Sequence, residues 1–293
     1  KRQLNAATGA VLGVVVVAML FYLRRKNKER SGGRSEARGS IAPEVKTGFS
    51  LEHTVAPGED RKTEGRAEVR IPAEQEAILK RLGIEWDGMR RKIRPGPDFK
   101  PLRLKSRIIF VRHGETFSVK KSNEDKAPRF QGAADESANQ LTPRGHEQAR
   151  DAVAKLRGII KDDPEVLFFT SPLNRARDTA KPSESFFGKK AEPTDLLREM
   201  NYGKLENLTE AEIRAKFGEE KFRAAHAYRD HDASVLFEGG ESYIELLSRA
   251  RGALLAIDGK LNGKTGVLFS HATLATAFQV LLGDPGTLDK DGF

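Results

Sequence analysis

Three short apolar runs stand out along the chain, each bounded by polar or charged residues. They occupy residues 108–111, 166–169 and 266–269. Runs of this length in such surroundings predict buried β-strands. Between them, apolar residues recur at helical spacing over residues 142–160 and 241–261. Strands that alternate with such helices predict an α/β fold, a three-layer sandwich whose mostly parallel sheet is covered by helices on both faces.

The first apolar run leads directly into Arg112-His113-Gly114-Glu115-Thr116. Open α/β sheets bind their ligands at the carboxyl ends of their strands, which is where this sequence lies. An imidazole can carry a phosphoryl group, and a guanidinium offers a planar fork to phosphate oxygens. Taken alone, this motif also fits a histidine in a surface turn. The third apolar run ends in the same way, at His271, which makes a second histidine at this edge of the sheet our expectation.

Further landmarks follow in order along the chain. They are Ser171-Pro172-Leu173-Asn174-Arg175-Ala176, then Glu199 within residues 197–206, then Gly239-Gly240-Glu241-Ser242. The ordered set resembles the histidine phosphatase superfamily, which includes the cofactor-dependent phosphoglycerate mutases. The resemblance begins near Lys105 and predicts a histidine phosphatase-like domain over residues 105–293.

The resemblance implies a catalytic group of His113, Glu199, Arg112 and His271. His113 attacks phosphorus and becomes phosphohistidine, and Glu199 first protonates the departing oxygen and then deprotonates water. The predicted phosphate-binding residues are Arg112, Arg175, His271, Gly114 and Thr116. The mechanism calls for no cofactor and no metal, because guanidiniums and the second imidazole neutralise the phosphate charge.

Two of these roles have competitors in the sequence. Arg177 lies two residues after Arg175, so on a helix only one of the two side chains faces the site. Glu206 and Glu115 are alternative acids to Glu199. Glu241 and Ser242 are expected to begin the following helix, with Ser242 as a short polar cap, although the family places this segment near the substrate.

The sequence also departs from the family pattern. Val119 stands where many members have an Asn. Asn123 is a nearby residue that can supply the missing amide, and otherwise this contact is lost. Ala272 follows the second histidine where Gly is usual, so its methyl group is expected to crowd the phosphate. The chain ends at Phe293, before the further strand and helix that members usually have, which indicates a truncated domain.

Residues 6–23 (Ala6 to Leu23) contain no charged side chain. A helix of this length spans roughly 27 Å, close to the hydrocarbon thickness of a bilayer. Basic residues follow at once, so residues 1–30 are expected to form a single transmembrane helix with a basic flank. The catalytic domain then lies on the cytoplasmic or matrix side, and a mitochondrial membrane is the favoured location. Because Lys1 is not Met, an upstream presequence is expected.

Residues 31–72 have the composition of a flexible linker, and residues 73–104 predict a basic helix-and-turn extension. Its helix occupies residues 73–82, and Trp86 and a Pro95-Gly96-Pro97 turn follow. From Lys80 to Lys105 there are nine Lys or Arg against three Asp or Glu. This cluster suits an anionic lipid or an acidic protein partner. Nucleic acid is disfavoured, because no zinc-finger or RNA-binding motif accompanies the cluster.

Composition narrows the functions further. The 293 residues carry a formal net charge of +9 and no cysteine, which excludes a disulfide framework and a thiol nucleophile. The favoured function is a membrane-tethered phosphatase that acts on a phosphoprotein or a small phosphorylated metabolite. One alternative is a degenerate family member that serves as a structural subunit of a membrane complex. A second is a phosphoglycerate mutase or bisphosphatase, which the short segment between Glu199 and Glu241 disfavours.

Overall fold

The computed structural model describes residues 68–161 and 163–283. At its centre lies a four-stranded parallel sheet in the order β3 (Arg107–Arg112), β6 (Thr265–Ser270), β4 (Leu167–Thr170), β5 (Ala191–Pro193). Arg112 pairs with Ser270, so the neighbouring strands β3 and β6 end level with each other. The His113 N–H continues the ladder by donating to the Ser270 carbonyl over 3.0 Å. This register places His113 and His271 side by side at one edge of the sheet.

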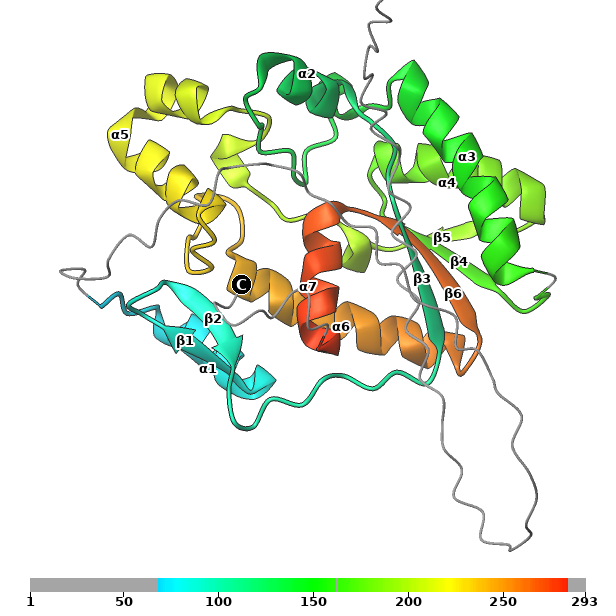
Figure 1. Cartoon of the computed structure of the whole chain (residues 1–293), viewed down its shortest axis with the longest axis horizontal. Coiled ribbons are helices and arrows are strands. Elements are labelled where there is room, and N and C mark those ends of the chain that lie inside the picture. The colour runs from blue at the N-terminus through cyan, green and yellow to red at the C-terminus, as the bar shows by residue number, and fades with distance from the viewer. Residues whose placement is uncertain (1–67, 162, 284–293) are drawn as a thin grey trace, which may run out of the picture.

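Helices cover both faces of the sheet, as the sequence predicted (Figure 1). On one face lie α3 (Pro143–Ile160) and α4 (Asn174–Phe187), which cover Ile109 and Val111. On the other lie α6 (Tyr243–Leu261) and α7 (Ala272–Leu282), which cover the alternate side chains of the same strand. Alternation along β3 thus supplies both cores, which identifies a strand buried on its two faces.

Side-chain caps fix where the two long predicted helices begin. Thr142 accepts a hydrogen bond from the Gly145 N–H and stays outside α3. Ser242 and Glu245 form a capping box that begins α6. Both helices end where the sequence predicted, at Ile160 and Leu261. The predicted role of Ser242 as a helix cap is therefore confirmed.

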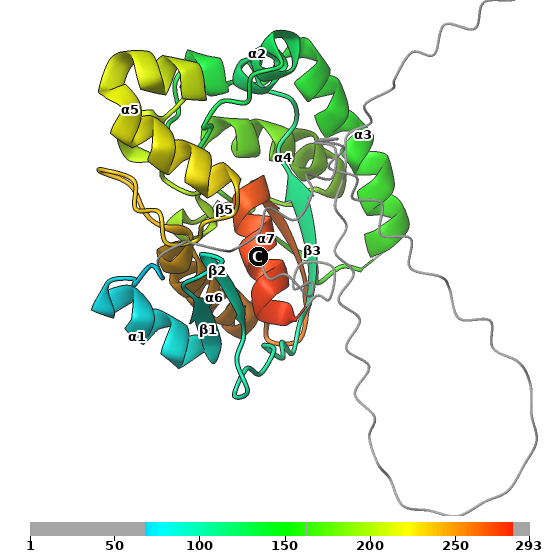
Figure 2. The same ribbon diagram turned by 60° about the vertical axis from the view of Figure 1, so that its left-hand side comes forward.

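The segment before the sheet contains α1 (Ala73–Leu82), at the predicted position, and a hairpin of β1 (Ile84–Asp87) with β2 (Lys92–Pro95). The sequence analysis did not predict the hairpin. Leu79, Ile84 and Ile93 are buried in the same hydrophobic cluster as α6 and α7. The segment therefore packs into the main core and is not a peripheral extension (Figure 2).

Two further helices lie toward the carboxyl ends of the strands (Figure 1). These are α2 (Phe117–Asp125) and α5 (Glu210–Arg229), and α5 has a kink at Gly218, where φ is 82°. Left-handed backbone of this kind favours glycine. The 3₁₀ turns are η1 (Ser137–Asn139), η2 (Asp195–Leu197) and η3 (Gly203–Leu205).

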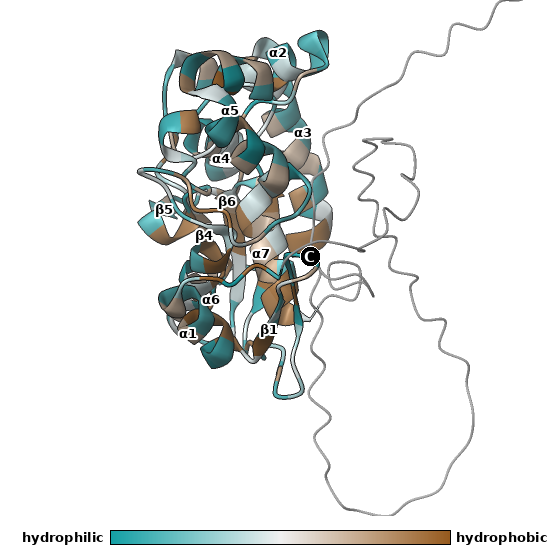
Figure 3. Cartoon of the chain, turned by 90° about the vertical axis from the view of Figure 1, so that its left-hand side faces the viewer, coloured by the Kyte–Doolittle hydropathy of each residue, from teal (hydrophilic) through white to brown (hydrophobic). Residues whose placement is uncertain are grey.

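In Figure 3, much of α7 and the sheet has the brown shades of hydrophobic residues, whereas α1 and α2 show much of the teal of hydrophilic residues. Within residues 68–161 and 163–283, no helix combines the length and the apolar character needed to cross a bilayer. The predicted anchor at residues 6–23 and residues 31–67 of the predicted linker (31–72) lie outside the described residues, as does the predicted end of the domain after Gly283. The linker was predicted to extend too far, because Val69 is bound to the hairpin: its N–H donates to the Gly88 carbonyl (3.1 Å) and its carbonyl accepts from Trp86 Nε1 (2.8 Å).

Candidate active site

The structure brings the two predicted histidines together. The ring centroids of His113 and His271 are 5.2 Å apart, and the rings are inclined at 57°. Both residues are buried, with exposed fractions of 8% and 0%. They follow the neighbouring strands β3 and β6, so the parallel register sets their spacing. The sequence located both residues, and the sheet explains why they meet.

The hydrogen bonds of His113 define which ring nitrogen is free. Its Nδ1 lies 2.8 Å from the carbonyl oxygen of Gly114. A carbonyl only accepts, so Nδ1 carries the proton and Nε2 keeps its lone pair. Burial lowers the pKa of His113 well below its usual range, and the charges of Arg175 and Arg112 lower it further. The ring is therefore neutral near pH 7, with one nitrogen available as a nucleophile.

His271 presents the opposite arrangement. Its Nε2 lies 2.8 Å from the Ser171 hydroxyl oxygen, and that oxygen also accepts from the Leu173 N–H over 3.3 Å. The hydroxyl has one proton to donate, and a bond from it to Nε2 places the proton of the neutral ring on Nδ1. That Nδ1 is buried and has no hydrogen-bond partner in the described part of the chain. Burial, followed by the charge of Arg175, lowers the pKa of His271 well below its usual range.

Two arginines accompany the histidines. Arg175 is fully buried on α4, whereas Arg177 is exposed, which confirms that only Arg175 faces inward. Arg175 donates to the backbone carbonyls of Ala134 (3.1 Å) and Gly132 (2.5 Å), and its Nε is buried without a partner among the described residues. The Nε of Arg112 is also buried without a partner among the described residues. Unpartnered guanidinium donors beside a histidine are the groups that an anion would satisfy.

Burial lowers the pKa of both arginines, and the nearby charge of Glu199 partly offsets this effect. Glu199 itself is 4% exposed. Its carboxylate accepts from the backbone N–H groups of Met200 (2.9 Å), Thr273 (3.0 Å) and Leu274 (3.1 Å). Two of these donors belong to the first turn of α7, directly after His271. This arrangement fixes the carboxylate next to the second histidine and within range of both arginines.

The alternative carboxylates have other partners. Glu206 accepts from the N–H groups of Gly132, Ala133 and Tyr202, at 2.8–3.0 Å, and so shapes the loop that Arg175 contacts. Burial raises the pKa of Glu206, against these hydrogen bonds. Glu115 accepts from the Thr142 hydroxyl at the start of α3. Of the three, only Glu199 contacts the turn that follows His271.

Two predicted phosphate ligands already have partners in this structure. The Gly114 N–H donates to the Thr179 hydroxyl over 3.0 Å. The Thr116 hydroxyl accepts from the Val119 N–H (3.2 Å), which caps α2, and from the Gln131 side chain (2.8 Å). These groups hold the loop, and their role as phosphate ligands stays a prediction. Gly114 is needed for another reason, because a Cβ there would lie 2.4 Å from the Gly145 carbonyl oxygen.

The residues that depart from the family pattern lie on two helices, α2 and α7. Val119 lies in the first turn of α2, and Asn123 lies on the exposed side of the same helix. Ala272 is the first residue of α7 and is half-buried. Within the described ranges, no group of three or more His, Asp or Glu residues is arranged to hold a metal ion.

A set of contacts that holds the loop of Glu199, here called the clamp, was not predicted from the sequence. The Arg249 guanidinium on α6 pairs with the Glu241 carboxylate (2.7 Å) and donates to the backbone carbonyls of Arg198 (2.9 Å) and Glu199 (3.3 Å). Glu241 also accepts from the Asn201 N–H over 3.1 Å. Glu241 therefore binds the loop that carries Glu199, a contact between distant segments that sequence spacing does not reveal.

Comparison with known proteins agrees with this geometry. The family description "Histidine phosphatase superfamily (branch 1)" matches residues 108–286, more than half of the chain. The chain belongs to the histidine phosphatase superfamily. It is 30% identical over 259 residues to a mannitol-1-phosphatase of Eimeria tenella, covering 74% of this chain and 78% of the relative.

Other relatives carry different activities. A 2,3-bisphosphoglycerate-dependent phosphoglycerate mutase of Bradyrhizobium sp. (strain ORS 278) is 32% identical, covering 60% of this chain and 80% of the mutase. A metal-independent phosphoserine phosphatase of Arabidopsis thaliana is 26% identical, covering 71% and 82%. Among solved structures, a putative alpha-ribazole-5'-P phosphatase from Escherichia coli aligns with a TM-score of 0.50 at 23% identity, covering 61% of this chain and 80% of that one, which shows the fold alone. The family includes phosphoric monoester hydrolases, and this class is the one to which the enzyme belongs.

Proposed function

We propose that the protein hydrolyses a phosphate monoester through a phosphohistidine on His113. The observation that carries the proposal is the pair of complementary histidines: an unprotonated Nε2 on His113 and an unpartnered Nδ1 on His271, flanked by two arginines with free donors. An electron pair and convergent positive donors are what an incoming phosphoryl group requires.

In the proposed reaction, the His113 Nε2 lone pair forms a bond to phosphorus while the ester P–O bond breaks. Arg112, Arg175 and His271 donate to the non-bridging oxygens. The departing oxygen takes its proton from the carboxyl group of Glu199. Water then attacks the phosphohistidine, Glu199 accepts a proton from that water, and the P–N bond electrons return to His113. Inorganic phosphate leaves, and the enzyme is restored.

For the substrate we favour a small phosphorylated metabolite or a phosphoprotein. Support for a metabolite comes from the Eimeria and Arabidopsis relatives, whose names give a sugar-alcohol phosphate and phosphoserine as substrates. A phosphoglycerate mutase or bisphosphatase activity is the second candidate, and the 32% identity to the Bradyrhizobium mutase favours it. A mutase would return the phosphoryl group from His113 to an acceptor hydroxyl rather than to water.

Hydrolysis should proceed without an added metal ion. We expect the purified protein to hydrolyse an aryl phosphate at the same rate with and without a chelator, because guanidinium and imidazole groups supply the charge neutralisation. The measurement is the release of the phenol in buffers that contain EDTA or a divalent ion. A rate that is lost with the chelator and restored by the ion would contradict the proposed mechanism.

The clamp around Glu199 gives a second expectation. Replacing Arg249 by Gln should slow an alkyl phosphate by about tenfold or more while slowing an aryl phosphate less, because a displaced Glu199 matters most for a poor leaving group. Arg251→Gln, two residues later on the same helix and exposed, is the matched control. An equal loss with both substrates would assign Arg249 a purely structural role.

We further propose that residues 6–23 anchor the protein in a membrane, with the catalytic domain on the cytoplasmic or matrix side and a mitochondrial membrane as the favoured location. The supporting feature is the uncharged run followed by a basic flank. Carbonate and high salt are then expected to leave the protein in the membrane pellet.

Two outcomes decide between this anchor and the basic cluster at residues 80–105. Release by salt alone would indicate surface attachment through the cluster, since salt screens exposed charges. Deleting residues 1–30 should release the protein without changing its rate on a small substrate. A deletion variant that stays with the membrane would contradict the single anchor.

A further inference from the structure

The nine basic residues between Lys80 and Lys105 do not form one uniform patch. Three of them pair with carboxylates: Arg90 with Asp87 (3.2 Å), Arg91 with Asp232 (3.7 Å) and Arg94 with Glu85 (3.1 Å). Their charge is therefore locally balanced. Among the described residues, the other cations of this segment are not balanced in this way.

Three of the remaining cations line one cavity of about 350 Å³, where they meet a cation from a distant helix. Lys80 and Arg81 come from the end of α1, Lys100 from the loop after the hairpin, and Arg251 from α6. All four are exposed, and within residues 68–161 and 163–283 none of the four forms an ion pair. The fold thus converges charges that the sequence keeps apart.

Helix polarity explains only part of this arrangement. Lys80 and Arg81 lie in the last turn of α1, where cations complement the negative end of the helix dipole. That effect does not account for Lys100 or Arg251, which lie outside α1. In the lining of the cavity, cations outnumber carboxylates four to one, Asp98 being the one carboxylate. An excess of this size suits a doubly charged phosphate better than a single carboxylate, and the two guanidiniums suit its oxygens.

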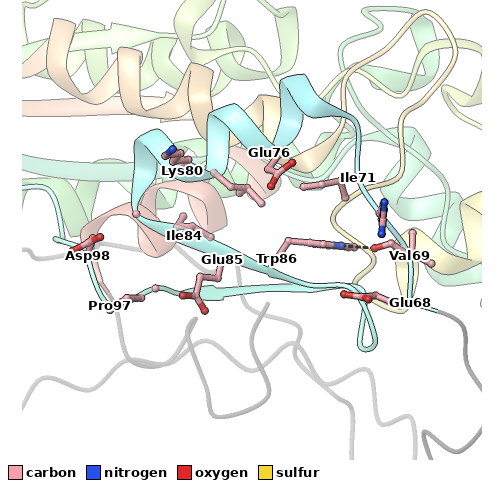
Figure 4. Close-up of a pocket in the computed structure, with 14 residues that line it drawn as sticks. Glu68, Val69, Ile71, Glu76, Lys80, Ile84, Glu85, Trp86, Pro97 and Asp98 are labelled. Carbon is pink, nitrogen blue, oxygen red and sulfur yellow. Dashed lines mark hydrogen bonds between the residues drawn. The ribbon is translucent and has the colours of Figure 1, made fainter.

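The rest of the lining is apolar. Leu82, Phe99 and Leu102 are half-buried, and Leu281, at the end of α7, is buried. The ligand therefore needs an apolar portion next to its anionic group. By contrast, the larger neighbouring groove between α1 and the hairpin, of about 680 Å³, is lined by Trp86 and by acidic residues that include Glu68, Glu76 and Glu85 (Figure 4). Lys80, Gly83 and Asp98 line both cavities, but carboxylates predominate in the groove and cations predominate in the smaller cavity.

We propose that the cavity formed by Lys80, Arg81, Lys100 and Arg251 is a second, non-catalytic site for a phosphate-bearing amphiphile. The four cations bind the phosphate group, and the apolar floor contacts the first carbons attached to it. The phosphate can be presented by a phospholipid headgroup in a bilayer or by a soluble phosphorylated amphiphile. This site is independent of the proposed chemistry at His113, since none of its residues contributes to the active site.

The test is hydrogen exchange of the full-length protein, read at the backbone amides of residues 98–102. Three probes are compared: monomeric dihexanoyl phosphatidic acid, inorganic phosphate, and phosphatidylcholine vesicles with or without phosphatidic acid. The double variant Lys100→Gln/Arg251→Gln removes two cations of the cavity. Arg103→Gln/Lys105→Gln removes the same charge from exposed positions of the same segment that do not line the cavity.

We expect the phosphatidic acid probes to slow exchange at residues 98–102 in the wild type and in the control variant. The cavity variant should need about tenfold more probe for the same protection, because each charge contributes modestly at a solvent-facing site. Protection by the short-chain lipid identifies a soluble amphiphile as a sufficient ligand, and protection by vesicles alone identifies a bilayer headgroup. Protection by inorganic phosphate alone, protection that is unchanged in the cavity variant, or no protection by any probe would overturn the proposal. Aryl phosphate hydrolysis should be equal in both variants, which separates this result from a failure of the catalytic proposal.

Discussion

Replacing His113 by Ala is expected to reduce phosphate release by about 10⁴-fold or more, as for other enzymes that lose their nucleophile. The reason is geometric. His113 is the residue whose Nε2 is left with a free lone pair by the Nδ1 contact to Gly114, whereas the Nε2 of His271 faces Ser171. Neither a neighbouring hydroxyl nor water can take over an in-line attack from that position.

The control for this variant is His146→Ala, since His146 is an exposed histidine on α3. Thermal unfolding of both variants verifies that the fold is intact. If the His113→Ala protein is folded and keeps more than a small fraction of the wild-type rate, then another residue is the nucleophile. A wild-type protein that is inactive on every phosphate monoester would instead favour the structural-subunit alternative.

Replacing Glu199 by Gln is expected to have the second-largest effect, and the effect should depend on the leaving group. General acid–base help is typically worth about 10²–10⁴-fold. An alkyl phosphate needs that proton and should slow by this amount in the first step. An aryl phosphate needs little protonation, so its first step should be nearly unaffected and phosphohistidine should accumulate, because the water step still requires the base.

Glu206→Gln is the matched comparison, because Glu206 is also buried among backbone N–H groups but shapes the loop at Gly132 and Ala133. This variant should lower the unfolding temperature and slow all substrates by a similar factor. If Glu206→Gln shows the leaving-group dependence and Glu199→Gln does not, the two roles must be exchanged.

Much of the fold followed from local pattern. The apolar runs before His113 and His271 predicted the neighbouring strands β3 and β6, because a strand buried on both faces has no polar alternation to obscure it. The helices over residues 73–82, 142–160 and 241–261 were predicted because spacing and capping residues agree. The hairpin of β1 and β2 was not, since its short strands are mostly half-buried and rich in charge, with the pattern of a turn.

The sequence predicted those residues of the candidate site whose role follows from their own side-chain chemistry. His113, Arg175, Glu199 and His271 were found by residue type and order, and the structure places them together. The contacts that depend on distant segments were missed. The bonds from Arg249 to the Arg198 and Glu199 carbonyls and the contact of the Ser171 hydroxyl with His271 each join residues far apart in the chain. The hydrogen-bond partners of Gly114 and Thr116 were missed as well, because proximity in sequence does not reveal them.

The central claim is a covalent phosphoryl group on His113. The most direct measurement is a rapid quench of the full-length Glu199→Gln protein with an isotopically labelled aryl phosphate, followed by peptide mapping. The account predicts one acid-labile, alkali-stable label on the peptide that contains His113, absent when His113 is also replaced by Ala. A label on a serine or threonine, no label during turnover, or a label that persists without His113 would contradict it.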